Sequence, residues 1–497
     1  MTADIKPYPA YKDSGVPWLG QVPDNWTVQR LSASITDFVA GTWGSEPNGR
    51  DDTICVRVAD FDRSRLRVRV DRPTIRAIAP ADLRRKRLTR GHLLLEKSGG
   101  GDLQPVGVVM LFDHEEVAVC SNFVARMSVT TGFEPEFLTY LHTTLYSIGL
   151  NVRSIKQTTG IQNLDCRAYL SESVAFPPLS EQVSIVRYLD HADRKMRHAI
   201  RARQQLIKLL TEQKQATIQR AVTRGLDPNV RLKPSGVPWL GDVPEHWEIR
   251  KVKYVLQTDG YRAGPFGSAL ITSQLNPSGT IEVLSPEHVA RASMNLDIDL
   301  FLPETREREM SQFLVKGRDI LFPIVGTLGR AMVVPRDVGK AIINQRLARL
   351  RPDETRINSD YLVLLMSKVT LYQELDRVEC KGSILDHITK ERILERPLPL
   401  PPLGEQRAIL QFVNAATASL DKAIYAARRE IDLLREYRTR LIADVVTGKL
   451  DVRGVKVPDD ETDVLPEDVE TIDDVDTVDQ TDDVTEGNSE SNAEETA

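Results

Sequence analysis

The 497-residue sequence has little cysteine and no long apolar run. Its four cysteines lie far apart and form no Cys-x-x-Cys pair, so neither a disulfide framework nor a zinc ribbon is predicted. No apolar segment approaches the roughly 18 residues that a membrane-spanning helix needs. The first residues, MTADIKPYPA, lack the apolar core of a secretory signal. These absences predict a cytoplasmic protein with no membrane partner.

Motifs of several enzyme classes are also missing. The sequence contains no P-loop, no Gly-x-Gly-x-x-Gly dinucleotide motif, no Asn/Asp-Pro-Pro-aromatic run of amino-methylating enzymes, and no zinc-hydrolase or zinc-deaminase pattern. Pro352-Asp353 followed by Glu379-Cys380-Lys381 imitates the layout of metal-dependent nucleases, but such loose spacing arises readily by chance. The chain is therefore predicted to be non-catalytic, with no catalytic residue, metal site or cofactor of its own.

Acidic residues outnumber basic ones, but their excess lies at one end. The chain has 65 Lys and Arg against 71 Asp and Glu, a formal net charge of −6. From Pro458 onward, 17 of 40 residues are acidic and none is basic, so this tail is predicted to be disordered. The rest carries 65 basic against 54 acidic residues, a formal charge of +11. A basic chain with an acidic tail points toward nucleic acid as a partner.

Two blocks of sequence occur twice. Ser14–Trp26 recurs as Ser235–Trp247 with ten of thirteen positions identical, an offset of 221. Pro177–Gln182 (PPLSEQ) recurs as Pro401–Gln406 (PPLGEQ), an offset of 224. The copies keep the same order, and each pair encloses a variable segment, about 32–176 and 253–396. A period this long with only two copies indicates a duplicated two-domain protein.

The segment after each PPL(S/G)EQ motif is predicted to be a long helix. No proline or glycine interrupts it before Gly225 or Gly448. Apolar residues recur at steps of 3, 4 and 7, the spacing of a coiled-coil seam or helix pair. The two helices are expected to pair with each other, although each could pack only on its own domain. The predicted helix-pairing residues are Val186, Leu189, Met196, Ile200, Ile207, Leu210, Leu410, Val413, Leu420, Ile424, Ile431 and Leu434.

The other blocks give weaker signals. Gly-Val-Pro-Trp-Leu-Gly predicts a docked loop, with Trp18 and Trp239 buried in apolar pockets or, less commonly, stacked on a base. Arg65–Val70 alternates with period two and predicts a strand with a basic face. Gly91–Leu95 and Gly317–Phe322 predict buried strands, each leading into a glycine-rich stretch.

With these motifs the sequence resembles the specificity subunits of type I restriction-modification systems. The resemblance is carried by Gly-Val-Pro-Trp-Leu-Gly with Val-Pro-x-x-Trp, by the PPL(S/G)EQ motif, and by the helix after each. Gly264–Ser268 and Gly317–Phe322 are similar to parts of that family's target-recognition domains. The match covers nearly all of residues 10–452, twice over and in the family's order; the acidic tail lies outside it.

The resemblance implies an α+β fold in which two globular target-recognition domains are joined by two long antiparallel coiled-coil helices, internally duplicated. Each domain would read one half of a bipartite double-stranded DNA site, and the helices would set the unread spacer. Two methylating modification subunits and two translocase/nuclease restriction subunits would bring S-adenosylmethionine, ATP and magnesium. The implied segments are domain 1 (1–178), the central helix (179–226), domain 2 (227–402), the C-terminal helix (403–452) and the acidic tail (453–497).

Candidate DNA contacts follow from side-chain chemistry and loop position. Phosphates are bound by Lys and Arg, and base edges are read by Arg, Lys, Asn and Gln, but an ordinary surface role is at least as common for any one residue. The basic run Arg84, Arg85, Lys86 and Arg87 is a candidate phosphate patch, or else a charged helix face. The other candidates are Lys97, Ser98, Arg153, Lys156, Gln157, Gln162, Arg262, Ser268, Arg330, Lys381 and Ser383.

Two other functions stay open from the sequence. One is a helical scaffold without DNA specificity, which the +11 charge argues against. The other is a modification enzyme with specificity fused into it, which the missing methyl-donor motif argues against.

Overall fold

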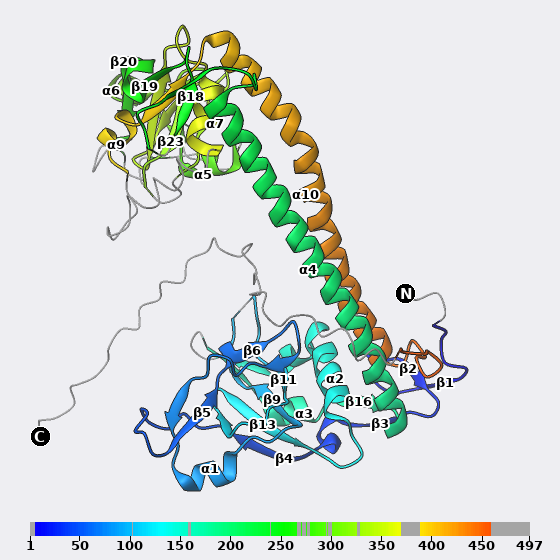
Figure 1. The fold of residues 1–497 in the computed structure, drawn as a ribbon. Coiled ribbons are helices and arrows are strands. Elements are labelled where there is room, and N and C mark those ends of the chain that lie inside the picture. The colour runs from blue at the N-terminus through cyan, green and yellow to red at the C-terminus, as the bar shows by residue number, and fades with distance from the viewer. Residues whose placement is uncertain are drawn as a thin grey trace, which may run out of the picture. The chain divides into compact units, whose positions relative to one another are not determined.

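The computed structural model describes residues 5–101, 103–157, 161–238, 240–265, 270, 275, 279–294, 296, 301–325, 329–368 and 388–458. Contacts divide the chain into two compact units. Unit 1 comprises Met1–His191 with Asp444–Ala497, and unit 2 comprises Ala192–Ala443. Both mix helices with short strands (Figure 1). No helix in the described residues is long and apolar enough to cross a membrane. The predicted acidic tail lies, beyond residue 458, outside the described part, and the predicted segment boundaries stay predictions.

Unit 1 is built around a six-stranded sheet. In spatial order its strands are β4 (Ile35–Ala40), β13 (Val124–Val129), β9 (His92–Glu96), β11 (Val109–Phe112), β7 (Arg67–Val68) and β6 (Phe61–Asp62). The run Leu93–Leu95 is fully buried in the middle, as its continuous apolar sequence predicts. Of the predicted strand Arg65–Val70, only β7 forms. Leu66 adopts a left-handed φ of 58° in the turn before it, so the alternating pattern does not form one long strand.

Smaller sheets and helices complete unit 1. The sheets are β12–β5–β8 (Ala118–Cys120, Asp52–Val56, Ile75–Ala77), β10–β15–β14 (Ser98–Gly99, Gln162–Leu164, Ile155–Gln157), β16–β3 (Ser173–Phe176, Thr27–Arg30) and β1–β2 (Tyr11–Asp13, Gln21–Pro23). The helices are η1 (Leu31–Ser34), η2 (Val58–Asp60), α1 (Pro80–Lys86), α2 (Pro135–Ser147), η3 (Leu150–Ser154) and α3 (Cys166–Leu170). Helix α2 packs on β11 through a stripe that includes Phe137, Leu141 and Leu145.

Unit 2 has its own sheets and core. The sheets are β20–β26–β23–β24 (Leu256–Ala263, Leu347–Pro352, Ile320–Pro323, Met332–Val333), β22–β21–β25 (Phe301–Leu302, Ile281–Leu284, Ala341–Ile343), β19–β27 (Glu248–Lys251, Pro397–Leu400) and β17–β18 (Leu232–Pro234, Asp242–Pro244). The helices are η4 (Val252–Val255), α5 (Pro286–Arg291), η7 (Glu304–Arg306), α6 (Glu307–Met310), η8 (Ser311–Phe313), α7 (Ser359–Lys368) and α9 (Lys390–Leu394). Trp247, Phe322 and Tyr361 lie in one buried cluster.

The two units share several strand pairings in the same chain order. β13 pairs antiparallel with β4 and β9, as β26 pairs with β20 and β23. β12 runs parallel to β5, as β25 runs parallel to β21. β16 closes back on β3, as β27 closes back on β19. The two variable segments, which differ in sequence, therefore have these pairings in common.

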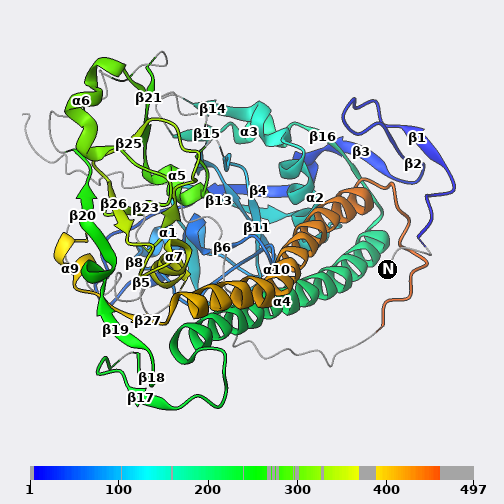
Figure 2. The same cartoon turned by 90° about the horizontal axis from the view of Figure 1, so that it is seen from above.

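Each closing strand leads into a long helix, α4 (Leu179–Arg224) or α10 (Leu403–Val446). The views of Figures 1 and 2 draw these helices side by side. Within unit 2, three ion pairs join them, and the residue number falls on α10 as it rises on α4. The pairs are Asp193–Arg438, Arg203–Glu430 and Lys214–Asp421. This order places charged partners along helices that run in opposite directions.

Candidate nucleic-acid interface

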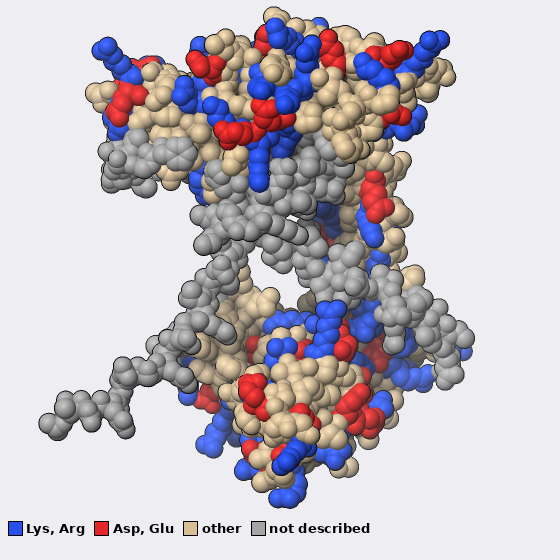
Figure 3. All heavy atoms as spheres, turned by 60° about the vertical axis from the view of Figure 1, so that its left-hand side comes forward, with Lys and Arg blue, Asp and Glu red and all other residues tan. Residues whose placement is uncertain are grey.

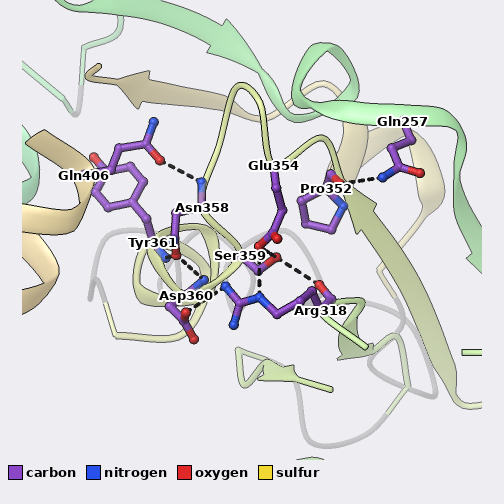
Figure 4. Close-up of polar contacts among 9 residues, drawn as sticks. All are labelled: Gln257, Arg318, Pro352, Glu354, Asn358, Ser359, Asp360, Tyr361 and Gln406. Carbon is purple, nitrogen blue, oxygen red and sulfur yellow. Dashed lines mark hydrogen bonds and ion pairs between the residues drawn. The ribbon is translucent and has the colours of Figure 1, made fainter. Parts of the chain in front are cut away.

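The glutamine of the PPL(S/G)EQ motif joins the start of each long helix to its own unit. The Gln182 amide oxygen accepts the Glu134 backbone N–H at 2.9 Å, and its nitrogen donates to the Pro177 carbonyl at 2.9 Å. In unit 2 the oxygen of Gln406 accepts the Asn358 N–H at 2.8 Å, beside α7 (Figure 4). Both glutamines are buried, with these bonds satisfying their amides. The repeated motif therefore fixes where each helix leaves its unit.

The glutamate of the motif holds the repeated tryptophan loop in unit 1. Glu181 accepts hydrogen bonds from Trp26 Nε1 at 2.8 Å, from the Tyr8 hydroxyl at 2.5 Å and from Asn25 Nδ2 at 2.9 Å. Trp26 is fully buried. Burial and the bond to Glu181 raise the pKa of Tyr8, which keeps its hydroxyl a donor. The prediction about Trp18 was wrong in part, because Trp18 is only half-buried and the second tryptophan of the repeat is the anchor.

Unit 2 uses the same positions differently. Trp247 is fully buried, but its Nε1 has no hydrogen-bond partner among the described residues. Glu405 is instead bonded to His246 Nε2 at 2.9 Å. Trp239, the other predicted anchor, lies outside the described residues.

In both units, a left-handed residue and a side-chain hydrogen bond fix the turn before the central buried strand. Arg318 adopts a left-handed φ of 73° and is held by ion pairs to Glu354 at 2.9 Å and Asp360 at 2.8 Å (Figure 4). Gly91, with φ of 90°, takes the equivalent place before β9. The next side chain in each unit accepts a backbone N–H from three residues earlier, Asp319 from Lys316 and His92 from Thr89. Gly317, Arg318 and Asp319 therefore shape the turn before β23.

Six predicted DNA-contacting residues of unit 1 lie on or directly beside the sheet β10–β15–β14. Ser98 lies opposite Asn163, and its hydroxyl donates to the Asn163 amide oxygen at 2.6 Å. On the other edge, Lys156 lies opposite Asn163 and Gln157 opposite Gln162. Lys97 directly precedes β10. Arg153, in η3, is exposed just before β14. Residues 55 or more positions apart thus lie on or beside one small sheet.

The burial of Gln162 and the ion pair of Lys156 limit what these two side chains can contact. Gln162 is buried, and its amide oxygen accepts the Val106 backbone N–H at 3.2 Å. Its buried side chain supports the framework, which contradicts the prediction that it reads a base. Lys156 is exposed and pairs with Asp165 at 2.7 Å, a bond that lowers the pKa of Asp165. A phosphate could replace that carboxylate as the partner of Lys156.

The basic run 84–87 forms the end of helix α1. Arg84, Arg85 and Arg87 are exposed, and their side chains have no ion-pair partner among the described residues. Lys86 is half-buried and pairs with Asp82 at 3.1 Å. The three arginines are available to bind phosphate, whereas the Lys86 side chain is used in an ion pair within the helix. In Figure 3, basic and acidic side chains are interspersed over the visible face of each unit.

Fewer of the unit 2 candidates can be placed. Arg330 is exposed and donates to the Ala290 carbonyl at 3.1 Å. Arg262 lies on β20 opposite the buried Arg349, and its Nε is buried without a hydrogen-bond partner in the described part of the chain. Ser268, Lys381 and Ser383 lie outside the described residues, as do Glu379 and Cys380 of the nuclease-like pattern. The described ranges hold no cluster of three or more potential metal ligands.

The predicted helix-pairing residues are less exposed than a second set of apolar residues on the same helices. Each of those twelve side chains is buried or half-buried, while Leu206, Leu209, Phe412, Tyr425 and Leu433 on the same helices are exposed. The predicted seam thus faces protein, and a second apolar set faces outward.

Comparisons with known proteins agree with this arrangement. Residues 244–427 match the family described as "Type I restriction modification DNA specificity domain". The MjaVIII type I restriction enzyme specificity subunit of Methanocaldococcus jannaschii is 25% identical over 319 residues, which are 62% of this chain and 70% of that protein. The MjaX specificity subunit of the same organism is 20% identical over 440 residues, which are 88% of this chain and 96% of that protein. A solved chain from a study of complex assembly and conformational transition of the type I R-M system shares the fold, with a TM-score of 0.64 and 16% identity, covering 86% of this chain and 98% of that one.

Proposed function

We propose that this chain, which belongs to the specificity subunits of type I restriction-modification systems, reads a bipartite DNA site with its two globular units. The observation that carries the proposal is that units 1 and 2 share one set of strand pairings while their variable segments differ. A duplicated scaffold with two different surfaces suits two different half-sites. Each unit then reads its half independently.

In unit 1 the DNA faces the sheet β10–β15–β14 and the end of α1. Arg84, Arg85 and Arg87 contact phosphates, which position the duplex without reading its sequence. Ser98 and Gln157 have the hydrogen-bonding groups that read base edges. The formal charge of +11 outside the acidic tail strengthens the attraction and makes it sensitive to salt.

The long helices pair as an antiparallel coiled coil and set the number of unread base pairs. The three interhelical ion pairs and the buried seam support this pairing. The outward apolar set, Leu206, Leu209, Phe412, Tyr425 and Leu433, is the docking surface for two modification subunits. Two restriction subunits complete the assembly. The partners hold S-adenosylmethionine, ATP and magnesium, and this chain performs no chemistry.

Exchange of one variable segment tests the division of labour. Residues 32–176 are replaced by those of a related subunit, and the host's methylated bases are mapped by sequencing with and without the variant. We expect one half of the methylated motif to change and the other to persist. A change in both halves, or in neither, would contradict independent reading.

The spacing role is tested by lengthening both helices together. Insertion just before Thr223, within one helix only, would displace Val222 from the core of unit 2. A better design adds four residues after Leu209 and four after Ile424, near matched heights of the pair. Four residues add about 6 Å and about one turn. The unread spacer should therefore grow by about one or two base pairs, each ~3.4 Å, with both half-sites unchanged. An unaltered spacer would contradict the role of the helices.

A further inference from the structure

A pocket of about 420 Å³ opens in unit 1 beside the sheet that carries Ser98. Its lining includes Trp43, Glu96, Ser98, Gly99, Asn122 and Phe123. Its volume is that of a small-molecule site. Neither the spacing role of the helices nor the phosphate contacts of α1 uses it.

Two aromatic side chains at this pocket are accessible to a flat ligand. Trp43 is 38% exposed and Phe123 is 43% exposed. The Arg76 guanidinium lies 4.7 Å from the centre of the Trp43 ring, and its Nε donates to the Trp43 carbonyl at 3.2 Å. These contacts hold the indole in place before any ligand arrives. Ordered, exposed aromatic rings are the platforms on which unstacked bases lie.

One oxygen of a buried carboxyl group in the same lining lacks a hydrogen-bond partner among the described residues. Glu96 is 2% exposed, and its Oε2 accepts no hydrogen bond from the described residues. Its nearest cation, Arg63 Nη2, is 3.9 Å away. Leaving such a group unsatisfied is costly, so a ligand that completes its hydrogen bonds gains affinity.

Gly99 lies next to this carboxyl group. Its φ of 119° is strained for a residue with a side chain, and a Cβ there would be in ordinary contact with Glu96 Oε1, at 3.5 Å. Burial raises the pKa of Glu96 to about 7, so near neutral pH a substantial fraction is protonated. A protonated carboxyl group offers one donor and one acceptor side by side. Adenine and cytosine match this with an amino group next to an acceptor ring nitrogen, and their amino group also donates to Oε2 of the ionised form. Thymine matches only the protonated form, because the two carbonyl oxygens beside its N3–H repel a carboxylate.

We propose that this pocket binds an unstacked adenine or cytosine of a DNA strand, with its ring on Trp43 and its amino edge at Glu96. The proposal rests on the proposed function, since it assumes that unit 1 meets DNA. It adds a recognition mode for a base outside the duplex stack. Phe123 forms the second wall of the pocket.

Binding of labelled single strands to the full-length chain tests the pocket. Oligo-dC, oligo-dA and oligo-dT of equal length are titrated against the unaltered chain, Trp43→Ala, Phe123→Ala and Glu96→Leu. The matched control is Phe38→Ala, which removes an exposed aromatic of unit 1 that does not line the pocket. We expect Trp43→Ala to weaken oligo-dC binding about tenfold and Phe38→Ala to leave it unchanged. Glu96→Leu should abolish the preference for dC and dA over dT.

Further measurements separate the possible failures. If Trp43→Ala unfolds, as judged by circular dichroism, the same loss is expected from Phe123→Ala. Equal binding by all variants, or equal binding of dC and dT by the unaltered chain, would overturn the pocket proposal. Random duplex at low salt is titrated in parallel, and failure to bind it would overturn DNA recognition itself. Tighter binding of free dCMP than of oligo-dC would assign the pocket to a nucleotide and overturn its role with DNA.

Discussion

The two tryptophan loops differ in how they are held, although they are nearly identical in sequence. In unit 1, Glu181 receives three hydrogen bonds, from Trp26, Tyr8 and Asn25. In unit 2, Glu405 is bonded to His246, and Trp247 is buried with its Nε1 unpaired among the described residues. The neighbouring glutamines, in contrast, keep equivalent bonds in both units.

The difference teaches which contacts the framework requires. The glutamine at the start of each long helix makes equivalent bonds to its own unit in both copies. The contacts of the glutamate, in contrast, depend on which other side chains lie nearby. Tyr8 reaches Glu181 from the N-terminal segment, where Arg453 also lies 4.8 Å from the Tyr8 ring. Unit 1 therefore has the more tightly bonded loop.

The largest effect is expected where the helices pair. Ile431→Asp places a charge in the buried seam and should lower the free energy of unfolding by about 4 kcal/mol. Leu433→Asp, two residues away and exposed, is the control and should stay within about 0.5 kcal/mol. Thermal unfolding of the full chain is measured for both variants. Equal stability of the two variants would contradict the seam.

Removing the two glutamates compares the loops directly. Glu181→Ala leaves three donors without their acceptor, two of them buried, and should lower the unfolding free energy by about 3 kcal/mol. Glu405→Ala breaks one exposed bond and should cost below about 1 kcal/mol. Denaturant titration measures both. Equal losses would show that the extra bonds of unit 1 add nothing.

The pH dependence of stability should also separate the units. Glu96 ends β9 with a pKa raised by burial to about 7 from 4.5, while Pro323 ends the equivalent strand β23. Because the folded pKa is the higher one, the stabilisation is complete below pH 4.5 and is lost as pH rises through 7. Glu96→Gln should therefore be about 3 kcal/mol more stable relative to the unaltered chain at pH 8 than at pH 4. Unfolding curves at the two pH values that shift in parallel would contradict this.

The smallest contrast is between the tryptophans. Trp26→Phe loses the bond to Glu181 and should destabilise by about 1 kcal/mol more than Trp247→Phe, which removes an unpaired N–H. Both substitutions leave the same small gap in a buried site, so the packing losses largely cancel in the comparison. Urea midpoints of the two variants provide the measurement.

Local sequence signals predicted the framework well. The absence of proline and glycine after each PPL(S/G)EQ motif marked α4 and α10, and the apolar runs marked β9 and β23. What failed depends on distant contacts. Glu181 meets Trp26 across 155 residues, and Gln162 meets Val106 across 56, and no local pattern reports either. The repeated blocks contain Trp26 and Gln182. The repeat could not show that Trp26 donates a hydrogen bond to Glu181, the residue next to Gln182.

In unit 1, hydrogen bonds join the segments near the two ends of the chain. Lys6 and Asp451 form an antiparallel bridge, with the Asp451 N–H donating to the Lys6 carbonyl at 2.9 Å, and Tyr11 donates to the Lys449 carbonyl at 3.3 Å. A short linker could therefore join these two segments. A gene rearranged to join these segments through a short linker, with new ends opened in the exposed turn at 226–228, would preserve every strand pairing described above.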